Sequence, residues 1–323
     1  MQTYAENRPY TPIDEAYLDL KKFEAYLKGE MKQDASESIK IPGCVSDYIL
    51  EKIKAISPIK SLSRITHTNA EKLDVVIDRA DFDQSGWITD NQAAPEKEGT
   101  VKKTSIELHE LFARPKVTQR LIGDSSIKIE DFIKDKIISQ MAAAENKAFL
   151  FGDGTNQPRG ILSYDLSCEG PADQKIEAIK TGEKGKIEHY IDLIKVMELL
   201  PSQYLCNAVW LMSRNAASAI RKLKDETSGL YLWQNSIAFG VPNTLLGYPV
   251  VVCDDMEKLS TSKATTPVLF GNFYEAYHIA ERQDITIIKD PYNSKPFVEF
   301  YATKRIGGDI VNFDAIKALR CEE

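Results

Sequence analysis

The chain is poor in the residues that usually carry metal or redox chemistry. Its 323 residues include five cysteines and four histidines, and no two cysteines form a Cys-x-x-Cys pair. This scatter predicts reduced, structural thiols and no zinc site. No apolar run approaches the roughly 20 residues that span a bilayer, and the polar N-terminus does not resemble a secretion signal. The sequence therefore predicts a protein made in the cytoplasm that has no contact with a membrane.

A basic excess is also missing. Lys and Arg number 41 against 48 acidic residues, which gives a formal net charge of −7. A protein that grips nucleic acid usually carries a basic stripe, so sequence-specific DNA binding is not expected. The chain could still enclose nucleic acid, because a container must not adhere strongly to its cargo. The 43% apolar and 28% charged residues are ordinary for a globular protein large enough for two domains.

Catalytic motifs are incomplete. Gly152-x-Gly154 with Gly160 lacks the spacing of a dinucleotide fingerprint and follows a helical pattern. His109-Glu110 has no second histidine at the spacing of a zinc protease, and no G-x-S-x-G elbow is present. We therefore expect no catalytic residue, no cofactor and no metal site. The alternative from a different functional class is an enzyme whose active site these motifs do not reveal.

A long helical pattern is the clearest feature that is present. Apolar residues recur at steps of three or four from Ser125 onward, so they line one face of a helix. These residues are Ile129, Ile133, Ile137, Met141, Ala144 and Ala148. The pattern ends in Gly152-Asp-Gly154, which predicts a sharp turn. About two dozen residues give a helix on the order of 35 Å long, which favours a structural strut.

The segment from Leu73 to Leu121 has a β pattern. Between Asp90 and Thr100 it is polar and contains Pro and Gly, which predicts the tip of an extended hairpin. An isolated two-stranded ribbon is marginal in water, so we expect another subunit to cover it.

Helices and strands mix without regular βαβ alternation over the rest of the chain, which favours an α+β fold. Strands are expected at 285–288 and 298–303, followed by a turn at Gly307-Gly308 and a short helix over Ala315–Leu319. The first 40 or so residues are polar and predict an arm that depends on a partner.

Several segments together resemble one family. Ala148-Phe-Leu-Phe-Gly-Asp-Gly-Thr with Pro158-x-Gly160-Ile-Leu resembles the end of the spine helix in major capsid proteins of tailed phages, which have the Hong Kong ninety-seven type shell fold. Further matching segments are Leu223-Lys-Asp, Gly229-x-Tyr-Leu-Trp233, Leu246-Gly-Tyr-Pro-Val250, Phe270-Gly-Asn-Phe273, Asp290-Pro-Tyr292, Arg305-Ile-Gly-Gly-Asp309 and Phe23-x-x-Tyr-Leu27. They occur in the family's order from about residue 23 to 320.

The resemblance implies an architecture. The implied parts are an N-terminal arm over 1–63, a P domain over 64–82, 109–158 and 279–303 with a spine helix at about 126–150, an E-loop over 83–108, and an A domain over 159–278 and 304–323. The E-loop hairpin would contact a neighbouring subunit through its tip, at Gln92, Pro95, Glu96, Lys97 and Glu98.

The resemblance also implies a function. Pentamers and hexamers of the chain would close into an icosahedral virion shell that encloses double-stranded DNA in a phage, prophage or gene transfer agent. Only about 30 to 40 residues precede Ile41, where many members have a scaffolding segment. Either the scaffold is a separate protein or Met1–Glu30 is its remnant, and a scaffold or protease and a portal protein are the expected partners. In the type member an E-loop lysine bonds to an asparagine of a neighbour. Phe297 stands near the place of that asparagine and Lys97 is a loosely placed partner, so no crosslink is expected. An encapsulin-type protein nanocompartment is the alternative.

Overall fold

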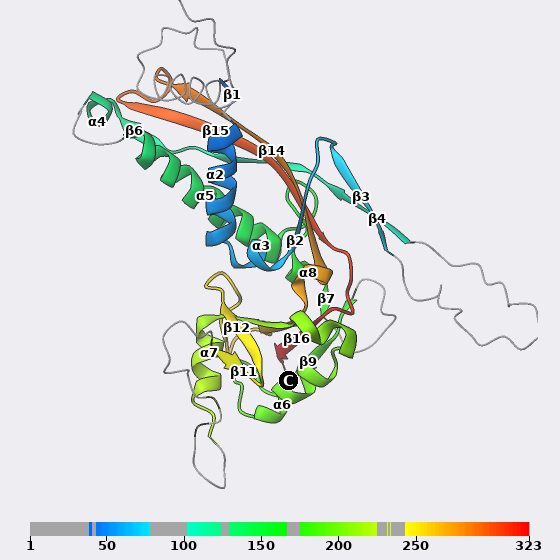
Figure 1. The fold of residues 1–323 in the computed structure, drawn as a ribbon. Coiled ribbons are helices and arrows are strands. Elements are labelled where there is room, and N and C mark those ends of the chain that lie inside the picture. The colour runs from blue at the N-terminus through cyan, green and yellow to red at the C-terminus, as the bar shows by residue number, and fades with distance from the viewer. Residues whose placement is uncertain are drawn as a thin grey trace, which may run out of the picture. The chain divides into compact units, whose positions relative to one another are not determined.

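The computed structural model describes residues 39–40, 43–77, 102–123, 129–166, 175–224, 231, 233 and 243–322 (Figure 1). The chain divides into two compact units. Unit 1 comprises residues 1–57, 110–145 and 282–306, and unit 2 comprises residues 58–109, 146–281 and 307–323. The predicted limits of the N-terminal arm, P domain, E-loop and A domain stay predictions.

Unit 1 packs helices on one face of an antiparallel sheet. Its helices are α2 (Gly43–Ile56), α4 (Gln119–Gly123) and most of α5 (Ile129–Phe151). Its strands are β1 (Ile39–Lys40), β5 (His109–Ala113), β6 (Lys116–Thr118), and parts of β14 (Tyr277–Asp290) and β15 (Phe297–Ile310). Inside lies one apolar cluster that joins residues of α2, α5 and the strands, including Ile53, Ile137 and Phe300.

Helix α5 has 23 residues, as the long helical pattern predicts. Ile133, Ile137 and Met141 are fully buried, which confirms the middle of the predicted stripe. The side chain of Ile129, at its start, lies outside the described residues. Ala144, however, is exposed, and the buried face continues through Glu145 instead. The prediction was wrong at Ala144 because it assumed that an alanine must face inward and a glutamate outward.

Unit 2 is built on a mixed six-stranded sheet in the order β11-β12-β10-β13-β16-β9. The strands are β9 (Ala178–Lys180), β10 (Val209–Met212), β11 (Thr244–Leu245), β12 (Tyr248–Val252), β13 (Thr265–Gly271) and β16 (Ile316–Cys321). Helices α6 (Tyr190–Glu198) and α7 (Arg214–Arg221) bury apolar faces in the same core. Trp210 anchors this core: its ring centroid lies 4.3 Å from that of Phe270, and its indole N–H donates to the carbonyl of Leu245.

Smaller elements complete unit 2. They are α3 (Pro58–Leu62), β2 (Arg64–His67), β7 (Asp165–Leu166), β8 (Lys175–Ile176), α8 (Phe273–Ala276) and the 3₁₀ helices η1 (Ile161–Ser163) and η2 (Ser202–Asn207). Strand β2 pairs in parallel with the start of β14, with His278 opposite Arg64.

Two expectations for the C-terminal region were wrong. The predicted turn at Gly307-Gly308 lies inside strand β15, where the glycines permit close approach: a Cβ on Gly307 would lie 2.1 Å from the carbonyl oxygen of Glu107. The predicted helix over Ala315–Leu319 is strand β16. Its residues are buried on both faces, so the strand lacks the alternation by which an exposed strand is recognised.

The predicted hairpin is present as a separate two-stranded antiparallel sheet. Strand β3 (Lys72–Ile77) pairs with β4 (Lys102–Glu107), with Lys72 opposite Glu107 and Ile77 opposite Lys102. Its first strand lies before residue 83, where the E-loop was expected to begin. The predicted tip lies outside the described residues.

Candidate functional site

Three segments that are distant in the sequence meet in unit 2 beyond the end of α5. The backbone N–H of Arg159 donates to the carbonyl oxygen of Gly308 over 2.9 Å. The hydroxyl of Tyr277 donates to the carbonyl oxygen of Arg159 over 2.7 Å. The hydroxyl of Tyr164 donates to the carboxylate of Asp309. We call Arg159, Tyr164, Tyr277, Gly308 and Asp309 the clasp.

The clasp is filled with protein atoms. A Cβ on Gly308 would lie 2.6 Å from the hydroxyl oxygen of Tyr277, and the guanidinium of Arg159 lies 3.9 Å above the ring of Tyr164. Burial raises the pKa of Asp309 and of Tyr164. Because the carboxylate of Asp309 already accepts from Tyr164 and from the N–H of Ile310, this acid is satisfied by its own chain. The residues of the clasp, which belong to the sequence motifs described above, therefore stabilise the fold.

Each unit has a hollow among its described residues. The hollow in unit 1 has a volume of about 290 Å³ and is lined by polar side chains of β5, β14 and β15, among them Glu110, Arg282 and Asp284. The hollow in unit 2, of about 190 Å³, is lined by Arg64, His278 and residues of β3 and α8. Among the described residues, no group of three or more His, Cys, Asp or Glu side chains could hold a metal ion.

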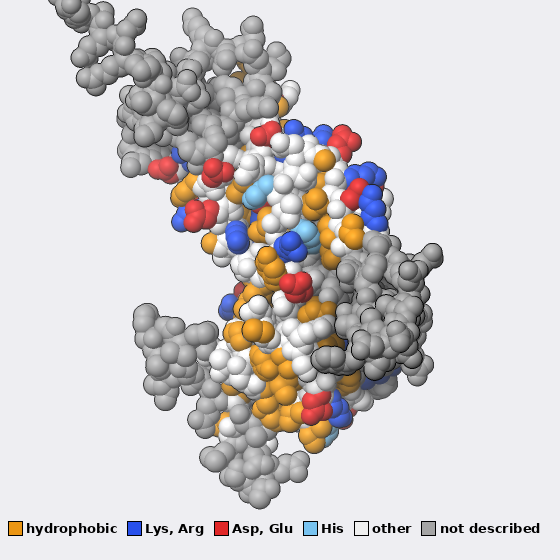
Figure 2. All heavy atoms as spheres, turned by 45° about the vertical axis from the view of Figure 1, so that its right-hand side comes forward, with side chains coloured by type: hydrophobic (Ala, Val, Ile, Leu, Met, Phe, Trp, Pro, Cys, Tyr) orange, Lys and Arg blue, Asp and Glu red, His pale blue; other side chains and the backbone are white. Residues whose placement is uncertain are grey.

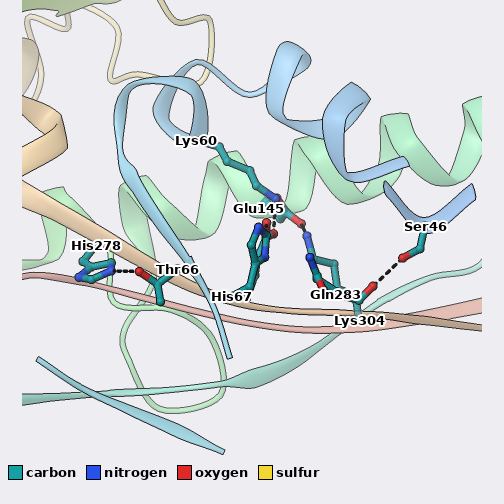
Figure 3. A network of polar contacts seen from close by, with 9 residues as sticks. Ser46, Lys60, Thr66, His67, Glu145, His278, Gln283 and Lys304 are labelled. Atoms are coloured by element: carbon teal, nitrogen blue, oxygen red, sulfur yellow. Dashed lines mark hydrogen bonds and ion pairs between the residues drawn. The ribbon is translucent and has the colours of Figure 1, made fainter. Parts of the chain in front are cut away.

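His278 shows what the unit 2 hollow can do chemically. Its ring nitrogen lies 2.7 Å from the hydroxyl oxygen of Thr66 (Figure 3). Burial, and then the nearby charge of Arg64, lower the pKa of this histidine. The ring is therefore neutral at physiological pH, and it contacts a hydroxyl of the neighbouring strand rather than an acid that would activate it as a general base.

The β3–β4 ribbon is a polar structure stabilised across its two strands. The ammonium of Lys72 bonds to the carboxylate of Glu107, and that of Lys103 lies 2.7 Å from a carboxylate oxygen of Asp74. These contacts lower the pKa of Asp74 and of Glu107. Val76 is 63% exposed on the same ribbon. A two-stranded ribbon is marginal by itself in water, so this one is suited to contact with another surface.

A cluster of charges holds the start of β15 in unit 1. The buried carboxylate of Glu299 accepts from Lys116 over 2.6 Å and from the guanidinium of Arg114 and the hydroxyl of Ser294. The bonds from Lys116, Ser294 and Arg114 lower the pKa of Glu299 to about 2. Nearby, Phe297 is 41% exposed opposite Thr118.

The structure does not test the predicted contact residues. Gln92, Pro95, Glu96, Lys97 and Glu98 lie outside the described residues. Sequence reasoning missed two buried ion pairs. Glu145 lies 2.8 Å from Lys304, and both are labelled in Figure 3; Lys60 lies 2.6 Å from Glu281. The sequence does indicate the first pair, because Glu145 follows Ile137 and Met141 at the same spacing of four residues and so falls on the buried face of the helix.

Comparisons with known proteins agree with this picture. The profile of the phage capsid family matches residues 38–321. The capsid protein of a native GTA particle, in a structure computed with C5 symmetry, is 34% identical; the match covers 83% of this chain and 91% of that one, with a TM-score of 0.72. The major capsid protein of Escherichia phage T5 is 19% identical over 244 residues. That match covers 73% of this chain and 52% of the T5 protein, so the chain spans about half the length of this curated relative.

More distant structures share the fold alone. A chain from Microbacterium phage Oxtober96 is 13% identical with a TM-score of 0.58, and the match covers 97% of this chain and 99% of that one. In the described part of the chain, no helix is long and apolar enough to cross a bilayer. The chain belongs to the phage capsid family and has the predicted α+β shell fold.

Proposed function

We propose that copies of this chain close into an icosahedral shell of pentamers and hexamers that encloses the double-stranded DNA of a phage or gene transfer agent. The match to the GTA capsid protein, at 34% identity over nearly the whole of both chains, supports this assignment. The net charge of −7 suits a wall that must not adhere to DNA. In Figure 2 acidic and basic side chains lie among one another on part of the described face, which suits a shell without sequence-specific DNA binding.

The observation that carries the proposal is the β3–β4 ribbon. A two-stranded sheet is marginal by itself, and this one has cross-strand ion pairs and an exposed Val76. We assign it to the base of the E-loop, whose tip residues Gln92, Pro95, Glu96, Lys97 and Glu98 contact a neighbouring copy. Many such contacts in a closed shell add up even when each is weak.

The remaining parts of the proposal follow from family membership. Residues 1–63 act as the N-terminal arm, and the P and A domains have the limits expected from the sequence. A separate scaffold or protease and a portal protein assist assembly, which takes place in the bacterial cytoplasm. The role in the shell is structural and requires no reaction, cofactor or membrane.

Electron microscopy of the expressed chain tests the proposal. Uniform closed particles are expected, and particles isolated with the other assembly proteins should absorb at 260 nm as DNA-filled shells do. A chain that stays monomeric under both conditions contradicts the assignment.

Deleting Gln92–Gly99 tests the role of the hairpin. The deletion should leave both units folded, with an unchanged circular dichroism spectrum, but should prevent the closure of shells because it removes the contact with the neighbouring copy. Replacing the same residues by a Gly-Ser segment of equal length is the matched control for chain length, and it should impair closure through the loss of side chains alone. Uniform shells from the deletion variant would show that the hairpin has another role.

An encapsulin-type compartment is the second candidate. The virus-like particle of Pyrococcus furiosus is 13% identical with a TM-score of 0.50, which shows a common fold alone. Protein cargo without nucleic acid in the isolated particles would favour this candidate.

A further inference from the structure

The hollow of about 190 Å³ in unit 2 combines a positive charge with exposed apolar groups. Arg64 of β2, Val76 of β3 and Tyr274 of α8 line it. Val76 is 63% exposed and Tyr274 is 51% exposed. Exposed apolar side chains that are scattered singly need no explanation, but these two lie at the same hollow. Because a cavity of about 150 Å³ accepts benzene, this hollow is large enough for one aromatic or long aliphatic side chain of another molecule.

The guanidinium of Arg64 is available to bind an anionic group. It lies 5.9 Å from the ring centroid of Tyr274, and it makes no hydrogen bond and no ion pair with another described residue. A guanidinium presents its N–H donors in a fixed plane, which fits a carboxylate through two parallel hydrogen bonds. Contact with the tyrosine ring restricts the arginine side chain before it binds, so less conformational entropy is lost on binding.

The groups around Arg64 leave its charge without a counterion. His278 lines the same hollow and is neutral, because burial and the charge of Arg64 lower its pKa. Glu275 also lines the hollow, but in the described part of the chain it makes no ion pair with Arg64. The hollow of unit 1 differs, since Arg282 lies 3.6 Å from Asp284 there. The hollow of unit 2 is therefore the one that offers a cation to a partner.

Two observations favour a second copy of this chain as the occupant. The hollow is continuous with the β3–β4 ribbon, because Val75 and Val76 of β3 line it, and we assign this ribbon to the base of the hairpin that contacts a neighbouring copy. The chain also has 48 acidic residues against 41 basic ones, so the surface of another copy has carboxylates to offer. The charge of the hollow therefore complements the excess charge of the chain.

We propose that the hollow of unit 2 receives a side chain of a second copy, with a carboxylate of that copy bound to Arg64 and an apolar group packed against Tyr274 and Val76. This inference rests on the proposed shell function. Arginine and tyrosine in a pocket are the residues that most often carry the energy of a protein contact. In a ring of like copies the hollow of each copy is filled by the next one, so a single contact of this kind repeats until the ring closes.

A photoreactive side chain at the hollow identifies the occupant. In the full chain, p-benzoylphenylalanine replaces Tyr274, and particles are assembled from a mixture of copies labelled with light and with heavy nitrogen. After irradiation, linked peptides that combine the two isotopes come from different copies. We expect such mixed pairs, with an Asp or Glu close in the sequence to the linked position. Links confined to a single copy, links to DNA, or the absence of links overturn the proposal.

The protein concentration at which particles form measures the strength of the contact. Arg64→Met removes the charge but keeps an extended side chain, and it should raise this concentration roughly tenfold or more. The melting temperature of the unassembled chain should not change, because the guanidinium bonds to no other described residue. Arg214→Met is the matched control: Arg214 is exposed in the same unit and pairs with Asp254 of its own chain at 2.9 Å, so assembly should be unaffected. Equal effects of the two substitutions on assembly, or a lower melting temperature for Arg64→Met, overturn the proposal.

The linked peptide also names the acid for a charge exchange. Arg64→Glu should prevent closure of the shell, and replacing the linked acid by arginine in the same chain should restore it, because every copy then offers the reversed pair. Failure to restore particles overturns the pairing of these charges.

The fate of this inference can be separated from that of the shell function. Particles that form without links between copies leave the shell function intact and overturn the inference alone. If the natural chain forms no particles, the proposed shell function fails. Irradiation of the concentrated, soluble chain then decides the inference, which the absence of links between copies overturns.

Discussion

Gly307→Ala is the sharpest test of how β15 approaches the ribbon in unit 2. A Cβ at this position would lie 2.1 Å from the carbonyl oxygen of Glu107, 2.9 Å from its carbonyl carbon and 3.2 Å from the Cγ2 atom of Ile106. An ordinary contact between carbon and oxygen is about 3.3 Å or more, so the two strands must separate by roughly 1 Å. Two of the three close atoms are backbone, and they cannot move aside as a flexible side chain could.

The cost should resemble that of overpacking a core, about 1–3 kcal/mol. A destabilisation of 1 kcal/mol lowers the melting temperature of a unit of this size by about 2–4 °C, so a fall of roughly 2–12 °C is expected. The strain acts on β4, which should therefore lose protection against hydrogen exchange more than the six-stranded sheet does. Calorimetry and hydrogen-exchange mass spectrometry measure the two effects.

Gly182→Ala is the control for this test. Gly182 has φ +78° and no neighbouring heavy atom within 4 Å of a Cβ, so an alanine there meets only backbone strain of about 1–2 kcal/mol. Exchange in β4 should stay unchanged in the control. If Gly307→Ala melts like the natural chain and β4 keeps its protection, the close approach of these strands does not constrain the fold.

Two further predictions concern single groups. The pKa of Glu299 is depressed to about 2 from 4.5, so its contribution to stability is fully present above pH 4.5 and disappears as the pH falls through about 2. Glu299→Gln should therefore flatten the acid side of the curve of stability against pH in this window. An unchanged curve would contradict the bonds to Lys116 and Arg114. Tyr277→Phe removes the buried hydroxyl that donates to Arg159 and should lower the free energy of unfolding by about 1–3 kcal/mol in urea titration, whereas no loss would show that this clasp bond contributes nothing.

Elements that have one buried and one exposed face can be predicted from the sequence. Helix α5 could be predicted because Ile133, Ile137 and Met141 repeat at a helical step, and the β3–β4 ribbon because polar turn residues separate two β patterns. Strand β16 could not, because an element buried on both faces shows no periodicity. The glycine pair of β15 was read as a turn, since a sequence does not show whether a glycine serves a turn or a close approach.

The candidate site was less predictable than the fold, for a physical reason. The clasp depends on Arg159, Tyr277 and Gly308 meeting in space, and nothing in the spacing of three distant segments indicates that they meet. The sequence shows the motifs, but it does not show which contacts their residues make. Once the hydrogen bonds are known, Gly308 has the role of admitting the ring of Tyr277, and Asp309 that of accepting from Tyr164.

This outcome explains why a shell protein can resemble its relatives in short motifs without having a reaction centre. The motif residues Arg159, Tyr277 and Gly308 of unit 2 bond to one another, whereas the contact with neighbouring copies is proposed for the tip of the hairpin, at Gln92–Glu98. A substitution in the clasp should therefore change stability first and assembly as a consequence. A substitution in the hairpin should change assembly while stability is kept, so the comparison of melting temperature with particle yield separates the two classes of residue.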